Sequence, residues 1–529
     1  MARVFVADSL HQTGLDLIAA EHEVIVKTGL SEDELVEELA DVQALLVRSQ
    51  TQVTERVIAA APKLEVIGRA GVGVDNIDLD AATQRGVIVV NSPLANTMST
   101  AEHAFGLMLA AARNVPQAHG SLRGGAWDRS KYAGVELSGR TLGIVGLGRI
   151  GTEVAHRARA FEMRVLAFDP FVSKGRASQL GVELRELDEL LAESDFVTLH
   201  TALHEGTRGM IGTEQLVLMK PTAILINAAR GALVDEQALY DAVDSGQIGG
   251  AAIDVFSEEP AVGNILTTHD RIICTPHLAA STAEAQLRAA TQTAEQILDI
   301  LAGRSARFAI NAPLVDEETM AIIGPYIDSA ELAGSVAMQL ANGGVEKVRI
   351  EYRGDISNYD TAPLRAAVIV GMLERVTTDK VTMVNALTMA EEHGLRLEEA
   401  NGPAIAPFAN RVTVHALCNG GDESVATTSS PTGPRIVGVG GYDIEVGTDS
   451  PYLIAIENVD RPGRIGHVAT LLGTWGVNIN AMSVSAGEEG RALMILAIST
   501  ERALTAEELA EVDELDDIRS VRQIELSSR

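Results

Sequence analysis

The 529-residue chain has little cysteine, few aromatic residues and no long apolar run. Its two cysteines, Cys274 and Cys418, are too few for a disulfide framework and do not lie in a metal-ligand spacing, so we expect no metal site. No apolar stretch approaches the roughly 18 residues that span a bilayer. The first residues also lack the shape of a signal peptide. These absences predict a cytoplasmic protein without a membrane partner.

Basic residues are scarce relative to acidic ones. The chain has 42 Lys and Arg against 73 Asp and Glu, which gives a formal net charge of −31. This charge disfavours binding to nucleic acid or to an anionic membrane surface. If the substrate is itself an anion, its site must gather arginines against an unfavourable overall field.

The length predicts about three to four domains. Short β-branched runs alternate with helical patterns over residues 3–90 and again over residues 141–274. This alternation predicts βαβ units and two consecutive α/β domains, each on a doubly wound parallel sheet. Residues 99–113 predict a helix buried against another unit, because apolar and small residues occupy several of its faces.

After residue 313 the regular alternation stops. A helical pattern, a strand, two helices and two glycine-rich turns follow, at residues 319–341, 347–352, 364–373 and 383–393 and around Asn419 and Gly438. We expect a separate α+β domain over residues 314–450. Residues 451–529 have the order βαββαβ, which predicts a ferredoxin-like domain.

A dinucleotide fingerprint follows the apolar strand at residues 142–145. Gly146, Gly148 and Gly151 form G-x-G-x-x-G and open an amphipathic helix. Gly146 allows a tight turn, Gly148 lets backbone N–H groups approach a pyrophosphate, and Gly151 lets the helix pack closely on the strand. The helix N-terminus, which begins with Arg149 and Ile150, stabilises the phosphate charge.

Asp169 ends the next strand, eighteen residues after Gly151. This is close to the spacing of a ribose-binding acid. Its carboxylate can accept hydrogen bonds from both ribose hydroxyls and would repel a 2′-phosphate, so the sequence predicts NAD rather than NADP.

Polar residues follow three later strands of the same unit. Arg230, Glu259 and His277 supply what hydride transfer from a hydroxy acid requires: a cation for the carboxylate, a partner for the base, and the base itself. A Glu259 carboxylate would stabilise the protonated form of His277, and Arg230 can bind a carboxylate with two parallel hydrogen bonds. Each residue alone is more often structural. Their joint occurrence after the fingerprint favours catalysis.

These segments resemble the D-2-hydroxyacid dehydrogenase family. GLGRIG…FDP, NAARGALVDEQAL, DVFSEEP and PHLAAST match its successive signatures in order, over about residues 3–310. The resemblance implies that Arg230, Glu259 and His277 form the catalytic trio. It also implies NAD contacts from Ala228, Asp254 and Ala280. The substrate domain is then discontinuous, with residues 1–97 and 284–313 on either side of a nucleotide domain at 98–283.

The segments VRSQT, RAGVGVDNID and NSPLANTMSTAEH narrow the resemblance to members that oxidise 3-phospho-D-glycerate, the first step of L-serine biosynthesis. Two arginines and a glycine-rich turn suit an anion, with guanidinium groups for phosphate and amides for carboxylate. The substrate contacts that the resemblance implies are Arg48, Arg69, Gly71, Val72 and Asn96. Residues 314–450 resemble the intervening domain of the long form of these enzymes.

The C-terminal segment 453–485 resembles an ACT regulatory domain, a small amino-acid-binding module. The resemblance implies a site for L-serine between two subunits, with Asn458, Asp460 and Asn478 as its candidate residues. A homo-oligomer, expected to be a tetramer, follows from it. A module that only assembles subunits is the alternative.

Two other functions fit parts of the pattern. One is a different 2-hydroxyacid dehydrogenase, such as a hydroxypyruvate or glyoxylate reductase, but Arg48, Arg69 and the additional C-terminal residues disfavour it. The other is a non-enzymatic, NADH-sensing protein that resembles a corepressor, and the intact trio disfavours that. NADH absorbance with phosphohydroxypyruvate separates the possibilities.

Overall fold

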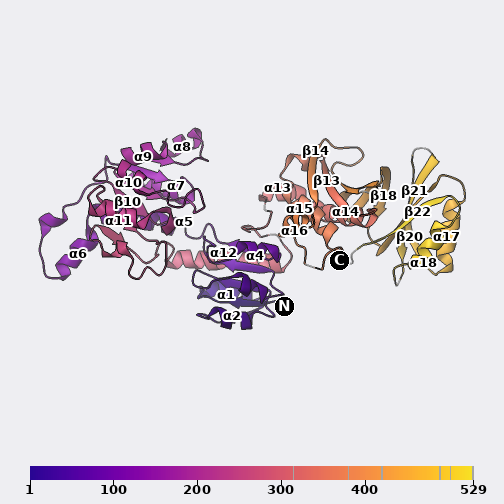
Figure 1. Ribbon diagram of the computed structural model, residues 1–529, viewed down its shortest axis with the longest axis horizontal. Helices are drawn as coiled ribbons and strands as arrows, with labels where there is room; N and C mark the ends of the chain where they lie inside the picture. Colours follow the sequence, from indigo (N-terminus) through magenta and orange to yellow (C-terminus); the bar gives the residue numbers. More distant parts are fainter. Residues whose placement is uncertain are drawn as a thin grey trace.

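The computed structural model describes residues 1–526 except 305, 314, 379, 419, 420, 488, 489 and 501. These residues form four sheets along an elongated molecule (Figure 1). The seven-stranded sheet lies at one end and the C-terminal sheet at the other. Within the described residues, no helix combines the length and hydropathy that a membrane crossing requires.

The first sheet has five parallel strands in the order β2-β1-β3-β4-β5. The strands are β1 (Arg3–Val6), β2 (Glu23–Val26), β3 (Ala44–Val47), β4 (Val66–Arg69) and β5 (Ile88–Asn91), and the intervening helices are α1 (Gln12–Ala19), α2 (Glu32–Glu38), α3 (Glu55–Ala59) and α4 (Leu79–Gln84). The alternation of strand and helix in the sequence is thus confirmed as a parallel sheet.

A distant helix completes this unit. Helix α12 (Ala283–Leu301) packs on α1 and β4 at two glycines. A Cβ at Gly14 would lie 2.8 Å from Ala290 Cβ, and one at Gly68 would lie 2.6 Å from Thr293 Cγ2. The absence of side chains at these positions lets the helix approach the sheet closely.

The second sheet has seven parallel strands in the order β12-β11-β10-β9-β6-β7-β8. They are β6 (Thr141–Val145), β7 (Arg164–Phe168), β8 (Glu183–Leu184), β9 (Phe196–Leu199), β10 (Ile224–Asn227), β11 (Gly250–Ile253) and β12 (Ile272–Cys274). The strand order reverses between β6 and β9. Ligands of open α/β sheets bind outside the carboxyl ends of strands at such a switch point.

Several helices accompany this sheet in the chain. They are α5 (Thr97–Ala112), α6 (Val115–Arg123), α7 (Arg149–Ala160), α8 (Lys174–Leu180), α9 (Leu187–Glu193), α10 (Thr213–Leu218) and α11 (Glu236–Asp244). Helix α5 lies against α7, β10 and β11, and Ala101, Ala104 and Met108 are buried. The expectation of a buried helix here is confirmed.

The third sheet is mixed, with the order β14-β13-β15-β16-β17-β18. Its strands are β13 (Val345–Arg353), β14 (Arg396–Gly402), β15 (Arg411–Cys418), β16 (Gly421–Ser430), β17 (Gly433–Val439) and β18 (Tyr442–Gly447), and its helices are α13 (Glu317–Ile323), α14 (Ile327–Leu340), α15 (Ala362–Leu373) and α16 (Ala386–Glu392). Helices α14 and α15 approach each other at glycine, since a Cβ at Gly371 would overlap the carbonyl oxygen of Glu331.

Two details of this region differ from the sequence-based expectation. Gly438 itself lies inside β17, at a bulge in its pairing with β16, and the glycine-rich turn follows it at Gly440 and Gly441. Asn419 lies outside the described residues. The expected helix 319–341 is interrupted at Gly324 and Pro325, where a 3₁₀ turn separates α13 from α14. Proline has no N–H for an intrahelical hydrogen bond, so a continuous helix is not maintained there.

The fourth sheet has the order β20-β21-β19-β22 and is antiparallel throughout. Along the chain its elements are β19 (Tyr452–Val459), α17 (Arg464–Thr474), β20 (Asn478–Ala486), β21 (Arg491–Ser499), α18 (Ala506–Asp513) and β22 (Ile518–Glu525). This confirms the ferredoxin-like βαββαβ fold. One face packs under α17 and α18, while Leu453 and Ile495 on the other face belong to the same core cluster as Val348 of β13.

The domain boundaries themselves stay predictions. The predicted boundary residue Leu314 and the last three residues, 527–529, lie outside the described part of the chain. Both cysteines are free and partly buried, and burial raises the pKa of Cys274 to about 11, as expected for an unreactive thiol.

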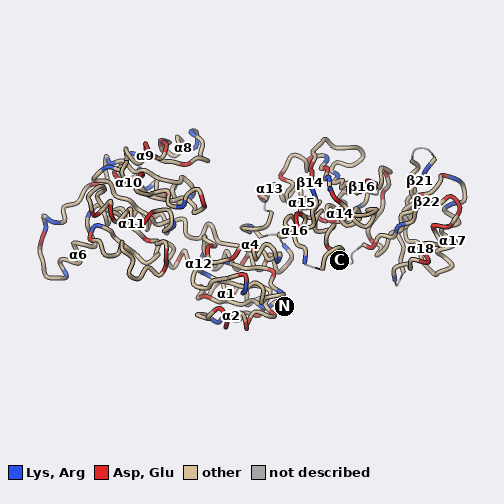
Figure 2. Tube along the Cα trace, viewed as in Figure 1, with Lys and Arg blue, Asp and Glu red and all other residues tan. Residues whose placement is uncertain are grey.

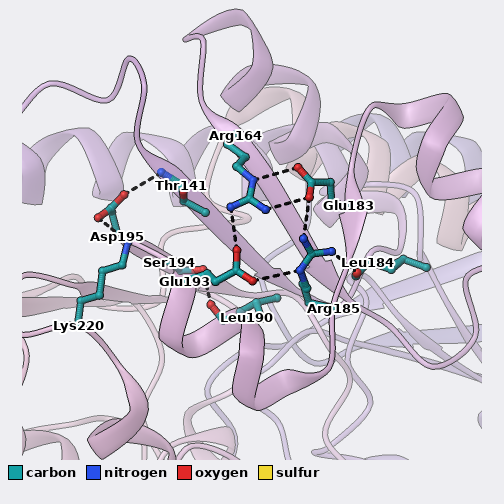
Figure 3. Close-up of polar contacts among 10 residues, drawn as sticks. All are labelled: Thr141, Arg164, Glu183, Leu184, Arg185, Leu190, Glu193, Ser194, Asp195 and Lys220. Carbon is teal, nitrogen blue, oxygen red and sulfur yellow. Dashed lines mark hydrogen bonds and ion pairs between the residues drawn. The ribbon is translucent and has the colours of Figure 1, made fainter.

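A network of ion pairs holds the short edge strand β8 (Figure 3). Arg164 donates to both carboxylate oxygens of Glu183 at 2.9 Å and to Glu193 Oε2 at 2.8 Å. Arg185 also reaches Glu183, at 2.8 Å, and Glu193, at 3.2 Å. The Arg164 hydrogen bond is the largest cause that lowers the pKa of Glu183 to about 2. The network therefore ties β7, β8 and α9 together.

We predict that Arg164→Met lowers the melting temperature of this unit. A depressed carboxylate pKa contributes stability that is present above the unfolded value and is lost as the pH falls. The difference from wild type should therefore be full above pH 4.5 and shrink between pH 4.5 and about 2. Calorimetry against Arg208→Met, an exposed arginine, measures this; equal melting temperatures at neutral pH and low salt would contradict it.

Candidate active site

A pocket lies between the first and second sheets and is lined by all of the predicted catalytic and substrate-binding residues. The first sheet's unit contributes Arg48, Arg69, Gly71, Val72 and Asn96, and the second contributes Arg230, Glu259, His277 and Ala280. A second groove is lined by Gly148 and Arg149 at the start of α7. The structure thus brings together residues that are distant in the sequence.

His277 and Glu259 form a close pair. His277 Nδ1 lies 2.7 Å from Glu259 Oε2, and Glu259 Oε1 accepts a hydrogen bond from Phe256 N at 3.1 Å. Burial acts to raise the pKa of Glu259, but the hydrogen bonds from His277 and Phe256 outweigh it, so the pKa lies below its usual value. Glu259 is therefore an ionised carboxylate that accepts a hydrogen bond from the Nδ1–H of His277, which leaves Nε2 of His277 for proton exchange.

A buried carboxylate shapes the segment that carries His277. Asp254 O accepts from His277 N at 2.8 Å, and the Asp254 carboxylate accepts from Leu278 N at 2.8 Å and Ala279 N at 2.9 Å. His277 itself has a φ of 54°, in the left-handed region. These three successive amides hold an unfavourable backbone conformation in place.

The Asp254 side chain is fully buried and lines neither groove. It also receives hydrogen bonds from Thr275 Oγ1 at 2.6 Å and from His103 Nε2 at 3.0 Å. Burial acts to raise the pKa of Asp254, but these hydrogen bonds, that from His103 foremost, bring it below its usual value. The expected contact of Asp254 with the nicotinamide stays a prediction. The sequence did not reveal His103, a single histidine in an apolar helix.

Arg230 belongs to the unit of the second sheet, and its side chain reaches the unit of the first sheet. It follows β10, where Asn227 holds the turn by bonding Ala229 N at 3.0 Å and Arg230 O at 2.9 Å. The guanidinium pairs with Asp75 at 3.2 Å, and a Cβ at Gly73 would overlap Arg230 Nη2. The absence of a side chain at Gly73 therefore leaves room for the Arg230 guanidinium at this position. Asp75 was not foreseen as its partner.

Two further arginines converge on the pocket. Arg69 lies over Gly71, whose φ is 154° and whose Cβ, if present, would overlap Arg69 Nη1. Burial lowers the pKa of Arg69 to about 10, and the charges of Arg230 and Arg48 act in the same direction. Arg69 Nε and Asn96 Oδ1 are buried and have no hydrogen-bond partner within the described residues. Mutual repulsion of three guanidinium groups favours an anionic ligand.

The wider molecule is acidic, and Figure 2 shows Asp and Glu along the whole tube. The concentration of arginines in this pocket is thus local. Arg48 is fixed by Asp8, whose carboxylate accepts from Arg48 N at 2.5 Å, while Arg48 Nη1 approaches Ser9 O at 3.4 Å. The backbone of Arg48 is anchored, and its guanidinium lines the pocket.

The glycine loop fits a dinucleotide. Gly146 has a φ of 95°, and a Cβ at Gly151 would overlap Gly146 O. Gly148 is the N-cap of α7, and no described atom lies within 4 Å of a Cβ built on it. Helix α7 therefore presents open backbone amides and the positive end of its dipole, as a pyrophosphate requires. Ile150 is half-buried against the apolar cluster that contains Ile144 of β6 and Val154 of α7.

Asp169 is oriented by the same loop. Its Oδ2 accepts from Leu147 N at 2.8 Å, and its Oδ1 accepts from Phe171 N at 2.9 Å. Each oxygen keeps a lone pair for a ribose hydroxyl. Ala228, directly after β10, is buried and lines neither groove, so its role stays a prediction.

The predicted effector residues lie on the fourth sheet, at two opposite ends. Asn458 and Asp460 are at the end of β19, where Val459 pairs with Arg491. Asn478 begins β20 and pairs with Ser499, at the other end of β21. Asn458 Oδ1 is buried and accepts no hydrogen bond within the described residues. One copy of the domain does not bring the three residues together.

The doubly wound sheet, the glycine loop with Asp169, and a histidine–carboxylate pair beside convergent arginines define an NAD-dependent dehydrogenase of anionic substrates. Comparison with known proteins extends this. Residues 105–279 match the family described as D-isomer specific 2-hydroxyacid dehydrogenase, NAD binding domain. Residues 322–440 match the D-3-phosphoglycerate dehydrogenase intervening domain.

Relatives match over nearly the whole chain. The D-3-phosphoglycerate dehydrogenases of Methanocaldococcus jannaschii and Bacillus subtilis are each 41% identical, over 99% of this chain and 100% of theirs. That of Mycobacterium tuberculosis is 42% identical over 93% of both chains. The chain therefore belongs to the D-isomer specific 2-hydroxyacid dehydrogenase family and, within it, to the D-3-phosphoglycerate dehydrogenases; its cofactor is NAD.

Solved structures agree for the catalytic part. A protein from Thermus thermophilus, 37% identical, superposes with a TM-score of 0.55 and covers 58% of this chain and 99% of its own. The D-lactate dehydrogenase of Aquifex aeolicus, described as a complex with NAD and lactic acid, is 28% identical with a TM-score of 0.53, and covers 59% of this chain and 100% of its own.

We predict that Asp169→Ala weakens NAD binding roughly 10-fold or more, because charge-assisted hydrogen bonds worth about 1.5–3 kcal/mol are removed. The preference for NAD over NADP should narrow, because the carboxylate that repels a 2′-phosphate is gone. Fluorescence titration of both reduced cofactors measures this, with the exposed Asp188→Ala as control. Equal wild-type affinity for NADP would refute the role of Asp169.

Proposed function

We propose that this enzyme oxidises 3-phospho-D-glycerate to 3-phosphohydroxypyruvate with NAD, the entry step of L-serine biosynthesis. The convergence of Arg48, Arg69 and Arg230 on one pocket beside the His277–Glu259 pair carries the proposal. A substrate with a carboxylate and a phosphate supplies enough negative charge to satisfy these three cations. The relatives of the same length are D-3-phosphoglycerate dehydrogenases.

The residues divide the chemistry among themselves. Arg230 binds the substrate carboxylate and orients the C2 hydroxyl toward His277. Nε2 of His277 takes the hydroxyl proton, and Glu259 stabilises the imidazolium that results. When bound, NAD supplies the acceptor for the hydride that leaves C2. In reverse, the protonated His277 returns its proton to the carbonyl oxygen.

The first sheet's unit contributes contacts to both ends of the substrate. Arg48 and Arg69 are the candidates for the phosphate, and the segment of Gly71 and Val72 is the candidate for the carboxylate, with the Gly71 N–H donating to Arg69 O at 2.8 Å in this structure. Asn96 brings an unpartnered carbonyl oxygen, which suits a hydroxyl donor. A reductase of unphosphorylated 2-oxo acids does not need this second pair of arginines. The cytoplasmic location expected from the sequence stays a prediction.

We predict that wild-type protein oxidises NADH with phosphohydroxypyruvate and that His277→Asn lowers turnover roughly 10²–10⁴-fold, since the proton-transfer group is lost. NADH binding should remain nearly intact, because the glycine loop is unchanged. Absorbance at the NADH band gives the rate, with the exposed His156→Asn on α7 as control. A non-enzymatic NADH-sensing protein would bind NADH without turnover, and near-normal turnover of the variant would remove His277 from the mechanism.

For the C-terminal domain we propose feedback inhibition by L-serine at a site shared between two copies. Asn458 and Asp460 lie at one end of the sheet and Asn478 at the other, and β20 is an edge strand on which Met482 and Val484 are exposed. When two β20 strands pair antiparallel across a twofold axis, Asn478 of one copy lies at the end of the partner's sheet that carries Asn458 and Asp460.

A tetramer requires a second kind of contact. Helix α6 projects from the second sheet at the far end of the molecule (Figure 1), and Leu122 and nearby Trp127 are exposed by 55% and 76%. Large apolar side chains gathered on a projecting segment are typical of a protein interface. Two independent twofold contacts, one here and one at β20, generate a closed tetramer.

We predict that Asp460→Ala and Asn478→Ala each abolish serine inhibition without changing uninhibited turnover. Because the two residues of one site come from different copies, refolding both variants together should restore part of the inhibition. Titration calorimetry and rate assays with L-serine measure this, with the exposed Asp513→Ala on α18 as control. No heat at millimolar serine together with an unchanged rate would leave the domain as an assembly module only.

A further inference from the structure

Helix α5 connects the substrate pocket with the segment that carries His277. Its N-cap residue Asn96 lines the pocket, and His103 lies seven residues later. Residues seven apart fall on one face of a helix, two turns from each other. The same face therefore meets the substrate at one end and the carboxylate of Asp254 at the other.

The contact of His103 with Asp254 defines which ring nitrogen of His103 carries a hydrogen. Its Nε2 lies 3.0 Å from Asp254 Oδ1 and 3.3 Å from Thr275 Oγ1. The Thr275 hydroxyl donates to the same Asp254 oxygen at 2.6 Å. An ionised carboxylate only accepts hydrogen bonds, so Nε2 must carry the hydrogen.

We propose that His103 is a positioning residue for the reaction, acting through Asp254 on His277. Asp254 is fully buried, and its backbone and side-chain oxygens hold the amides of His277, Leu278 and Ala279. The direction of its carboxylate thus decides the path of this segment. His103 contributes the donor from the helix side that fixes this direction.

The orientation of the Asp254 carboxylate matters because His277 has a strained backbone conformation. A residue other than glycine with a φ of 54° is held there only if its surroundings impose it. When the donor at His103 is removed, the carboxylate is free to turn toward Thr275, and the amides of Leu278 and Ala279 lose their alignment. A small displacement of a catalytic group is costly, because proton transfer depends on hydrogen-bond geometry.

Two substitutions of similar volume separate donation from packing. His103→Gln keeps an N–H donor at about the reach of Nε2, whereas His103→Leu fills the space without one. This inference rests on the proposed role of His277. We expect the Leu variant to lower kcat with phosphohydroxypyruvate roughly 10-fold, with a smaller change in KM. The Gln variant should stay within about 2-fold of wild type.

A second measurement does not depend on the substrate. Hydrogen exchange at the amides of Leu278 and Ala279 should accelerate in His103→Leu and remain at the wild-type rate in His103→Gln, with the exposed His156→Gln as control. If both variants behave alike, in rate or in exchange, the donor role is refuted. If wild type fails to turn over phosphohydroxypyruvate, the proposed function is wrong, and the exchange comparison still decides the role of His103.

Discussion

The chain passes twice between its two parallel sheets, and the active site depends on this double crossing. Helix α5 leaves the first sheet after β5 and lies against the second, and α12 leaves the second sheet after β12 and packs back on β4 and α1. The carboxyl ends of both sheets therefore face one pocket. Residues from both sides, such as Arg69 and Arg230, meet there although neither sheet alone would assemble a site.

Within this frame, two glycines leave room for arginine side chains in the pocket. A Cβ at Gly73 would collide with Arg230, and a Cβ at Gly71 with Arg69. The glycine-rich turn at Gly71 and Gly73, which the sequence predicts as an anion-binding loop, thus also leaves space for two guanidinium groups. Backbone amides and arginines share the pocket because the loop has no side chains at these two positions.

The sequence predicted the parallel sheets, the ferredoxin-like end and the residues of the pocket, since strand ends and short signatures are local features. It did not predict His103 or Asp75, whose importance depends on contacts with Asp254 and Arg230 that are distant along the chain. The strands β15 to β18 were also underestimated. Threonine and serine within the strands, as in residues 427–430 of β16, weaken the apolar alternation that identifies a strand, although Thr427 and Thr428 are buried.

One feature of the regulatory half affects how the protein can be divided. The face of the C-terminal sheet that carries Leu453, Ala455 and Ile495 belongs to the same apolar cluster as the core of the intervening sheet. The sequence predicts two separate C-terminal domains, but the two sheets share one hydrophobic cluster. A gene fragment that ends before Pro451 would expose part of this cluster to water, so the smallest natural unit to exchange between relatives is the pair of folds.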